Sequence, residues 1–225
     1  MKIYSYFAAV PELSLYDETK LALLWRERWS AAGFEPFILS EWHAQLHPDF
    51  AAVNEAVSKL PSVNPVNYER ACWLRWVALA AAGAGFMVNM TNGAVGGLMS
   101  DLDVMPYSIK PLKDLFPSPG KLIMYQERAP SLVYADAETC ARLFKHFGDL
   151  TLGNRPQGDR PHFSDQYLIE DLAAAGADWI EKRNLVLGYG DAGWETAAAV
   201  HYSNGSMTPA GKTPRWKHIP LLRTK

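Results

Sequence analysis

Two aspartates, Asp101 and Asp103, stand one residue apart in an otherwise apolar stretch, residues 98–104. We expect this stretch to form a short buried strand, whose period of two would put both carboxylates on the same side. Two carboxylates on one side repel each other unless a positive charge lies between them. Hard oxygen ligands suit Mg²⁺ or Mn²⁺, ions that usually hold substrate phosphates as well. The spacing therefore favours a divalent metal site, and a solvated turn with two aspartates is the alternative.

Arg75 lies in the middle of a strong helical pattern, residues 67–83. The second half of this pattern is apolar on all sides, which is typical of a buried helix. Because arginine stays charged, a buried one needs a carboxylate or phosphate partner. Arg75 therefore contacts either a ligand in a site or an internal acid, for which Glu69 and Asp103 are candidates.

Three later residues could complete such a site. Asp165 and Gln166 open a helix that Ser164 is expected to cap, and the helix dipole favours a carboxylate there whether or not it has a further role. His201 lies in a late strand, residues 198–202. A neutral imidazole can complete a Mn²⁺ site begun by carboxylates, so His201 is a candidate third ligand. A structural histidine is the alternative.

The end of the chain, from about residue 205, carries positive charge without any acid. Its five cations are Lys212, Arg215, Lys217, Arg223 and Lys225. Such a run is ordinarily solvated. Lys212 and Arg215 would nevertheless suit a diphosphate leaving group, because positive charge stabilises the negative charge that develops there.

The arginine-bearing helix, a glycine-rich turn and a strand with D-x-D together resemble one group of enzymes. They are the nucleotide-sugar-dependent glycosyltransferases of the GT-A fold, in particular the family with a sugar-binding region containing a DXD motif. Arg75 matches the family's arginine, Gly83 and Gly85 its glycine pair, and Asp101 and Asp103 its acidic pair. Two features depart from the pattern: Cys72 stands where the family has an aspartate, and residues 86–97 resemble an insertion before the strand.

The resemblance implies roles for individual residues. It places the nucleotide base and ribose at Ser5, Tyr6 and Phe7, at the end of the first expected strand. Asp165 and Gln166 look like the Asp-Gln pair that several GT-A families place near the donor sugar.

For the metal, the resemblance implies Asp101 and Asp103, with His201 completing the Mn²⁺ or Mg²⁺ site. Asp101 would thereby also contact the donor. Arg75 and Asp165 would orient the sugar, so the expected catalytic residues are Arg75, Asp165 and Gln166.

The opening of the chain predicts an α/β fold. Residues 3–8 and 34–39 read as strands with a helix between them, and such a unit implies parallel strands joined by a right-handed crossover. A chain of 225 residues suits one domain. We therefore expect residues 1–225 to form a single GT-A-like domain, with a mostly parallel sheet flanked by helices and a basic tail.

Composition excludes some partners. The net charge of −2 makes nucleic acid an unlikely partner, and no apolar run approaches the length of a membrane span. The two cysteines indicate no disulfide framework, and the start of the chain lacks a clear signal sequence. The sequence therefore predicts a cytoplasmic protein without a transmembrane segment.

These observations predict a metal-dependent glycosyltransferase. It would move a sugar from a nucleoside-diphosphate sugar, with UDP-sugar as the first choice, to a hydroxyl acceptor such as a glycan. One alternative is a catalytically impaired carbohydrate- or nucleotide-binding protein of the same fold, motivated by Cys72 and the insertion. The other is a sugar nucleotidyltransferase, although residues 8–12 lack the glycine and the cation that such enzymes usually have after the first strand.

Overall fold

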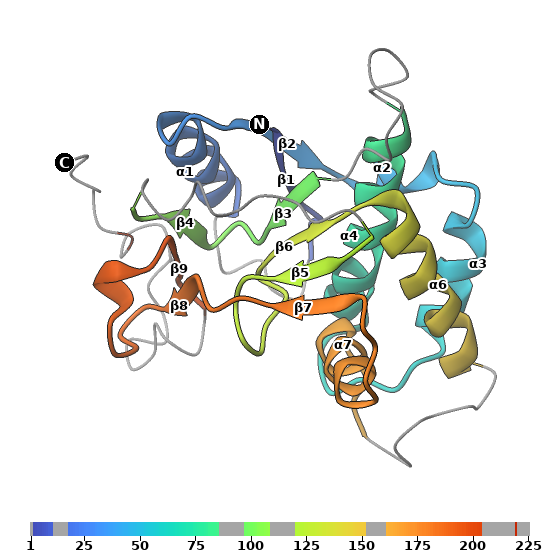
Figure 1. Ribbon diagram of the computed structural model, residues 1–225. Helices are drawn as coiled ribbons and strands as arrows, with labels where there is room; N and C mark the ends of the chain where they lie inside the picture. Colours follow the sequence, from blue (N-terminus) through green and yellow to red (C-terminus); the bar gives the residue numbers. More distant parts are fainter. Residues whose placement is uncertain are drawn as a thin grey trace.

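The computed structural model describes residues 2–10, 18–85, 97–108, 120–151, 161–203 and 219. These residues form two β-sheets with helices around the larger one (Figure 1). The strands are β1 (Lys2–Tyr6), β2 (Glu35–Leu39), β3 (Gly97–Ser100), β4 (Val104–Pro106), β5 (Leu122–Met124), β6 (Leu132–Ala135), β7 (Ile180–Lys182), β8 (Val186–Gly188) and β9 (Ala199–His201). The helices are α1 (Glu18–Ala31), α2 (Glu41–Gln45), α3 (Phe50–Ser58), α4 (Val66–Gly85), α6 (Ala137–Thr151), α7 (Asp165–Ala174) and the 3₁₀ helix η2 (Trp194–Thr196).

The larger sheet has six strands in the order β2-β1-β3-β6-β5-β7. β1 runs parallel to both β2 and β3, and β5 runs parallel to β7. β6 is antiparallel to both of its neighbours, β3 and β5. The predicted β-α-β opening is confirmed as β1, α1 and β2, and the sheet is mostly parallel as the sequence predicts. The smaller sheet has the order β4-β9-β8.

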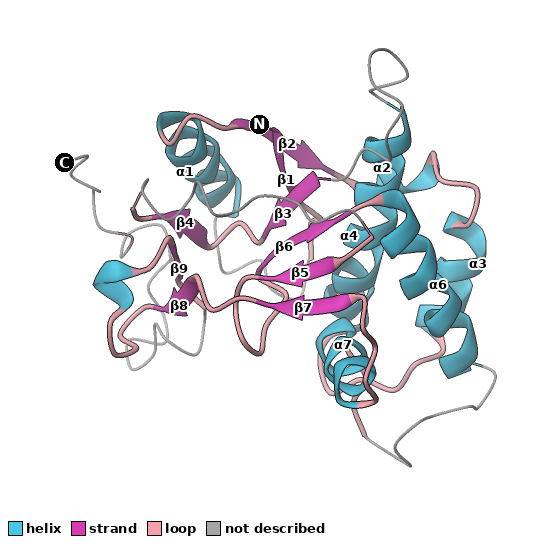
Figure 2. Cartoon of the chain, in the orientation of Figure 1, coloured by secondary structure: helices cyan, strands magenta, loops and turns pink. Residues whose placement is uncertain are grey.

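Alternate residues of the large sheet pack into two different cores. Tyr4 and Met99 belong to the core shared with α2, α3, α4, α6 and α7. Ile3 and Leu98 belong to the core shared with α1 and the smaller sheet. Both faces of the sheet are therefore covered (Figure 2), which explains why its central strands β3, β5 and β6 are mostly apolar and fully buried.

The expected strand over residues 98–104 is wrong in one respect that matters for the site. β3 ends at Ser100, and β4 begins at Val104 in the smaller sheet. Between them the chain turns, and the backbone N–H of Val104 donates to the carbonyl of Asp101 over 3.1 Å. Asp101 and Asp103 therefore lie in the turn that joins the two sheets, and the turn rather than strand alternation sets their directions.

The expected glycine-rich turn at Gly83 and Gly85 is also wrong, because α4 continues to Gly85. Alanine, the best helix former, dominates the residues before and between these glycines. A single glycine in such a segment weakens the helix by only about 1 kcal/mol, which tertiary packing readily offsets. No helix of the described residues, α4 included, is both long and apolar enough to cross a membrane.

Candidate active site

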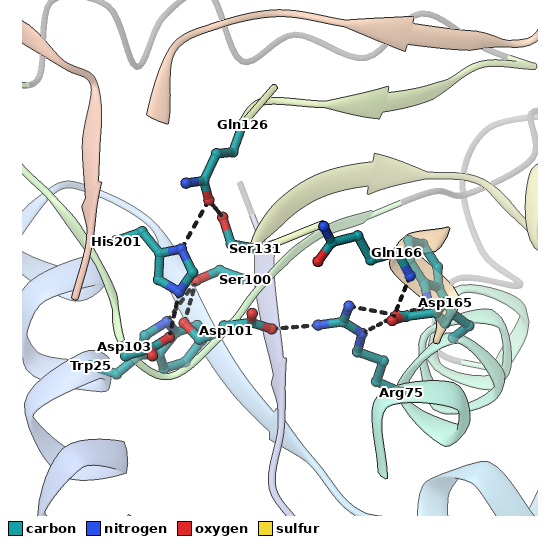
Figure 3. A network of polar contacts seen from close by, with 11 residues as sticks. Trp25, Arg75, Ser100, Asp101, Asp103, Gln126, Ser131, Asp165, Gln166 and His201 are labelled. Atoms are coloured by element: carbon teal, nitrogen blue, oxygen red, sulfur yellow. Dashed lines mark hydrogen bonds and ion pairs between the residues drawn. The ribbon is translucent and has the colours of Figure 1, made fainter. Parts of the chain in front are cut away.

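Two carboxylates and an imidazole converge where the two sheets meet. Ligand atoms of Asp101, Asp103 and His201 all lie within 4.8 Å of one another. The register of β4 and β9 brings them together, because it pairs Val104 with His201. The backbone N–H of Tyr202 then donates to the carbonyl of Asp103 over 2.8 Å. A histidine nearly 100 residues away in sequence thus lies beside the D-x-D turn (Figure 3).

Arg75 connects this acidic group to the start of α7. Its guanidinium donates to Asp101 Oδ1 through Nη1 over 2.5 Å. It also donates to Asp165 Oδ2 through Nε over 3.0 Å and through Nη2 over 2.5 Å. Its acidic partners are therefore Asp101 and Asp165, and the two that the sequence suggested, Glu69 and Asp103, are not those it bonds. Both partners come from other elements, at separations that helix spacing cannot reveal (Figure 3).

Asp165 is held from several sides. Ser164 caps α7, as predicted, by accepting a hydrogen bond from the Tyr167 backbone. Besides Arg75, the indole of Trp76 donates to Asp165 Oδ2 over 2.8 Å, and the backbone N–H of Gln166 donates to Oδ1 over 2.9 Å. The Gln166 side-chain amide donates to Glu170 over 3.4 Å, along the helix rather than toward Arg75. Asp165 is thus a buried carboxylate with hydrogen bonds at both of its oxygens.

Arg75 and the acidic residues around it shift one another's pKa values. Burial alone would lower the pKa of Arg75, but the carboxylates of Asp165 and Asp101 outweigh it and raise that pKa, so the guanidinium stays charged. Burial, together with the nearby Asp103 carboxylate, raises the pKa of Asp101 to about 6, against the opposing effect of Arg75. Asp101, Asp103 and Asp165 thus bring three carboxyl groups to this part of the described chain, and a divalent cation is a suitable partner for the pair in the D-x-D turn. Two carboxylates and an imidazole are a suitable ligand set for Mn²⁺ or Mg²⁺.

The predicted nucleotide contacts of β1 lie at the same edge of the sheet, because Tyr4 pairs with Met99 and β1 and β3 run in the same direction. Ser5 is fully buried, and neither its hydroxyl nor that of Tyr6 has a hydrogen-bond partner among the described residues. Burial raises the pKa of Tyr6 to about 12. Phe7 packs against the core shared with α1. Lys212 and Arg215 lie outside the described residues.

Several neighbours of the site carry no clear signal in the sequence. Gln126 and Ser131, in the loop between β5 and β6, contact His201 and the D-x-D turn. Tyr68 lies seven residues before Arg75, and Cys72, burial and the charge of Asp101 raise its pKa. Seven residues are two helical turns, so this spacing could have placed Tyr68 on the Arg75 face of the helix.

A family model described as a domain of unknown function, DUF8765, matches residues 1–98, and curated proteins give no match. Among solved structures, the apo form of mouse xyloside xylosyltransferase 1 is similar at a TM-score of 0.55 and 12% identity, over 93% of this chain and all of that one. A glycosyltransferase involved in the glycosylation of the major capsid of PBCV-1 is similar at 0.53 and 13%, over 96% of this chain and 97% of that one. The chain has the GT-A fold.

The GT-A fold confirms the fold class predicted from the sequence. At these sequence identities the similarity establishes the fold alone, so the chemistry has to be inferred from the residues of the site. In this GT-A chain the candidate metal ligands stand at the junction of the two sheets, and Arg75 joins them to Asp165.

Proposed function

We propose that this protein is a metal-dependent glycosyltransferase that moves a sugar from a nucleoside-diphosphate sugar, with UDP-sugar as first choice, to a hydroxyl acceptor such as a glycan. The observation that carries the proposal is the convergence of Asp101, Asp103 and His201 within 4.8 Å. Those residues come from a turn and from a strand far apart in sequence, and they lie on a fold that the two glycosyltransferases above share.

The metal ligands would be Asp101, Asp103 and His201. A bound Mn²⁺ or Mg²⁺ would hold the diphosphate and offset the negative charge that develops on the leaving group. The two carboxylates repel each other unless a positive charge lies near them, and Arg75 donates to one of them, Asp101. The donor set thus fits a hard divalent ion.

The donor sugar would lie between the metal ligands and α7. Arg75 donates to both Asp101 and Asp165, so it fixes the distance between the D-x-D turn and the start of α7. Asp165 and Gln166 begin α7 and would orient the sugar. Ser5, Tyr6 and Phe7 would contact the base and ribose, and Lys212 and Arg215 would meet the leaving diphosphate.

The test is donor binding and turnover with a panel of nucleotide sugars. We expect one UDP-sugar to raise the melting temperature with Mn²⁺ present and not in EDTA, and to be hydrolysed slowly or transferred to a glycan acceptor. Asp103→Asn should abolish both effects, because it removes a charged metal ligand. Asp178→Asn, an exposed aspartate far from the turn in sequence, is the matched control and should behave as the wild type.

Two outcomes would count against the proposal. Equal nucleotide binding in EDTA and in Mn²⁺ would remove the metal from the mechanism. Metal-dependent binding of a UDP-sugar without hydrolysis or transfer would favour the catalytically impaired binding protein. Cys72, in place of an aspartate one helical turn before Arg75, is the residue that motivates this second reading.

A further inference from the structure

Gln126 has no role in the site described so far, yet it contacts the candidate metal ligand His201. It follows β5 and lies in the loop that leads to β6. Its side-chain oxygen Oε1 lies 2.9 Å from His201 Nδ1. The hydroxyl of Ser131, a fully buried residue in the same loop, donates to that oxygen over 2.5 Å (Figure 3).

This contact decides which nitrogen of His201 carries the proton. With Oε1 of Gln126 toward the ring, the 2.9 Å contact is a hydrogen bond when Nδ1 carries the proton, because an amide oxygen only accepts hydrogen bonds. In a neutral imidazole the other nitrogen, Nε2, then bears the lone pair. Nε2 is the atom that faces Asp103, at 3.5 Å from Oδ1.

The distance between His201 and Asp103 agrees with this tautomer. A charge-assisted N–H···O bond is about 2.7–2.9 Å long, so 3.5 Å is too long for a proton held between Nε2 and Oδ1. Nε2 and Oδ1 would therefore both be able to offer a lone pair to a metal ion.

The same loop also fixes the other side of the ligand group. The carbonyl of Ser131 accepts from the backbone N–H of Asp101 over 2.7 Å. Ser131 thus holds the D-x-D turn with its backbone and Gln126 with its hydroxyl. The loop between β5 and β6 positions Asp101 and His201 relative to each other, although neither of its two residues is a ligand.

We propose that Gln126, held in place by Ser131, is a positioning residue that keeps His201 in the Nδ1–H tautomer and so presents Nε2 to the metal. The effect on metal binding rests on the proposed function. The tautomer itself does not, because it exists in the metal-free protein. If the amide of Gln126 were turned around, its NH₂ would donate to Nδ1 and the proton would lie on Nε2. A measurement of the His201 tautomer therefore distinguishes the two orientations.

The first experiment is NMR of the metal-free protein with ¹⁵N-labelled histidine, with the His201 signals assigned by their loss in His201→Asn. We expect the wild type to show the Nδ1–H tautomer, although neutral histidine in water favours Nε2–H. Gln126→Leu removes the acceptor and should shift His201 toward Nε2–H. Gln126→Glu keeps an acceptor and should retain Nδ1–H. Glu127→Gln, at an exposed residue of the same loop, is the control and should match the wild type.

The second experiment is Mn²⁺ affinity by calorimetry. Because loss of a residue that orients a metal ligand typically weakens binding by about 10–100-fold, we expect that loss for Gln126→Leu and not for Gln126→Glu or Glu127→Gln. A wild-type His201 protonated on Nε2 would overturn the proposal, and so would equal Mn²⁺ affinity in Gln126→Leu. Absence of Mn²⁺ binding in the wild type would instead contradict the proposed function, so the two failures are distinguishable.

Discussion

Arg75 stands between two acidic regions that are built differently. At Asp165, one carboxylate that is 3% exposed accepts from Arg75, from Trp76 and from the backbone of its own helix. At the D-x-D turn, two carboxylates lie close together with a histidine, and Arg75 contacts one of them. In the first region the protein supplies hydrogen-bond donors to a single carboxylate, whereas the second region places two carboxylates close together.

This difference predicts different effects on stability when an acid is removed from either region. The buried Asp165 carboxylate, with hydrogen bonds at both oxygens, holds α7 against α4. Its removal would leave Arg75 buried with Asp101 as its remaining acidic partner. A cluster with surplus negative charge contributes little to folding, because like charges repel, but it attracts a cation. The two regions should therefore respond in opposite ways to loss of an acid and to addition of a metal.

The largest expected effect is on stability. Asp165→Ala breaks a buried ion pair, so it should lower the free energy of unfolding by about 3–5 kcal/mol. Asp103→Ala, measured without metal, should leave that free energy unchanged or raise it, since it removes repulsion with Asp101. Urea denaturation of both variants measures the contrast, with Asp178→Ala as the control. Similar decreases in the free energy of unfolding for Asp165→Ala and Asp103→Ala would show that the two regions contribute equally to stability.

Metal addition should give the next largest effect. A ligand that binds only the folded state stabilises it by about 2.7 kcal/mol at 100 times its dissociation constant. At 100 times its dissociation constant, we expect Mn²⁺ to raise the free energy of unfolding of the wild type by about 2.7 kcal/mol and that of Asp103→Asn not at all. Urea denaturation with and without Mn²⁺ measures both values. Stabilisation of both proteins would place the ion away from the D-x-D turn.

The smallest effect distinguishes two helix caps. Ser164 caps α7 beside the site, and Asp136 caps α6 by accepting from the Thr139 backbone over 2.8 Å. Alanine at either position should lower stability by about 1–2 kcal/mol. Because Asp165 follows Ser164 directly, Ser164→Ala should also lower sugar transfer, whereas Asp136→Ala should leave it unchanged. Steady-state kinetics below the melting temperature would measure this. Equal activities of the two variants would show that the Ser164 cap does not affect the site.

Local patterns in the sequence determined most of the elements. The strand patterns of β1 and β2, the cap Ser164 and the helical period of α4 are properties of neighbouring residues, and the structure confirms these elements. The sequence also indicated the kind of site, because a close carboxylate pair favours a cation and a buried arginine needs an acidic partner. Strand β7 was missed, since its three residues, Ile-Glu-Lys, carry no clear apolar pattern.

Only the tertiary structure decided how the site is connected. Arg75 meets Asp101 and Asp165 at separations of 26 and 90 residues, and His201 meets Gln126 across 75. The change of sheet after Ser100 likewise depends on strands that come later in the chain. Periodicity reports which face a residue occupies, but strand order and register decide which faces meet. That is why the sequence could name Arg75 as an arginine in need of a partner and could not name its partners.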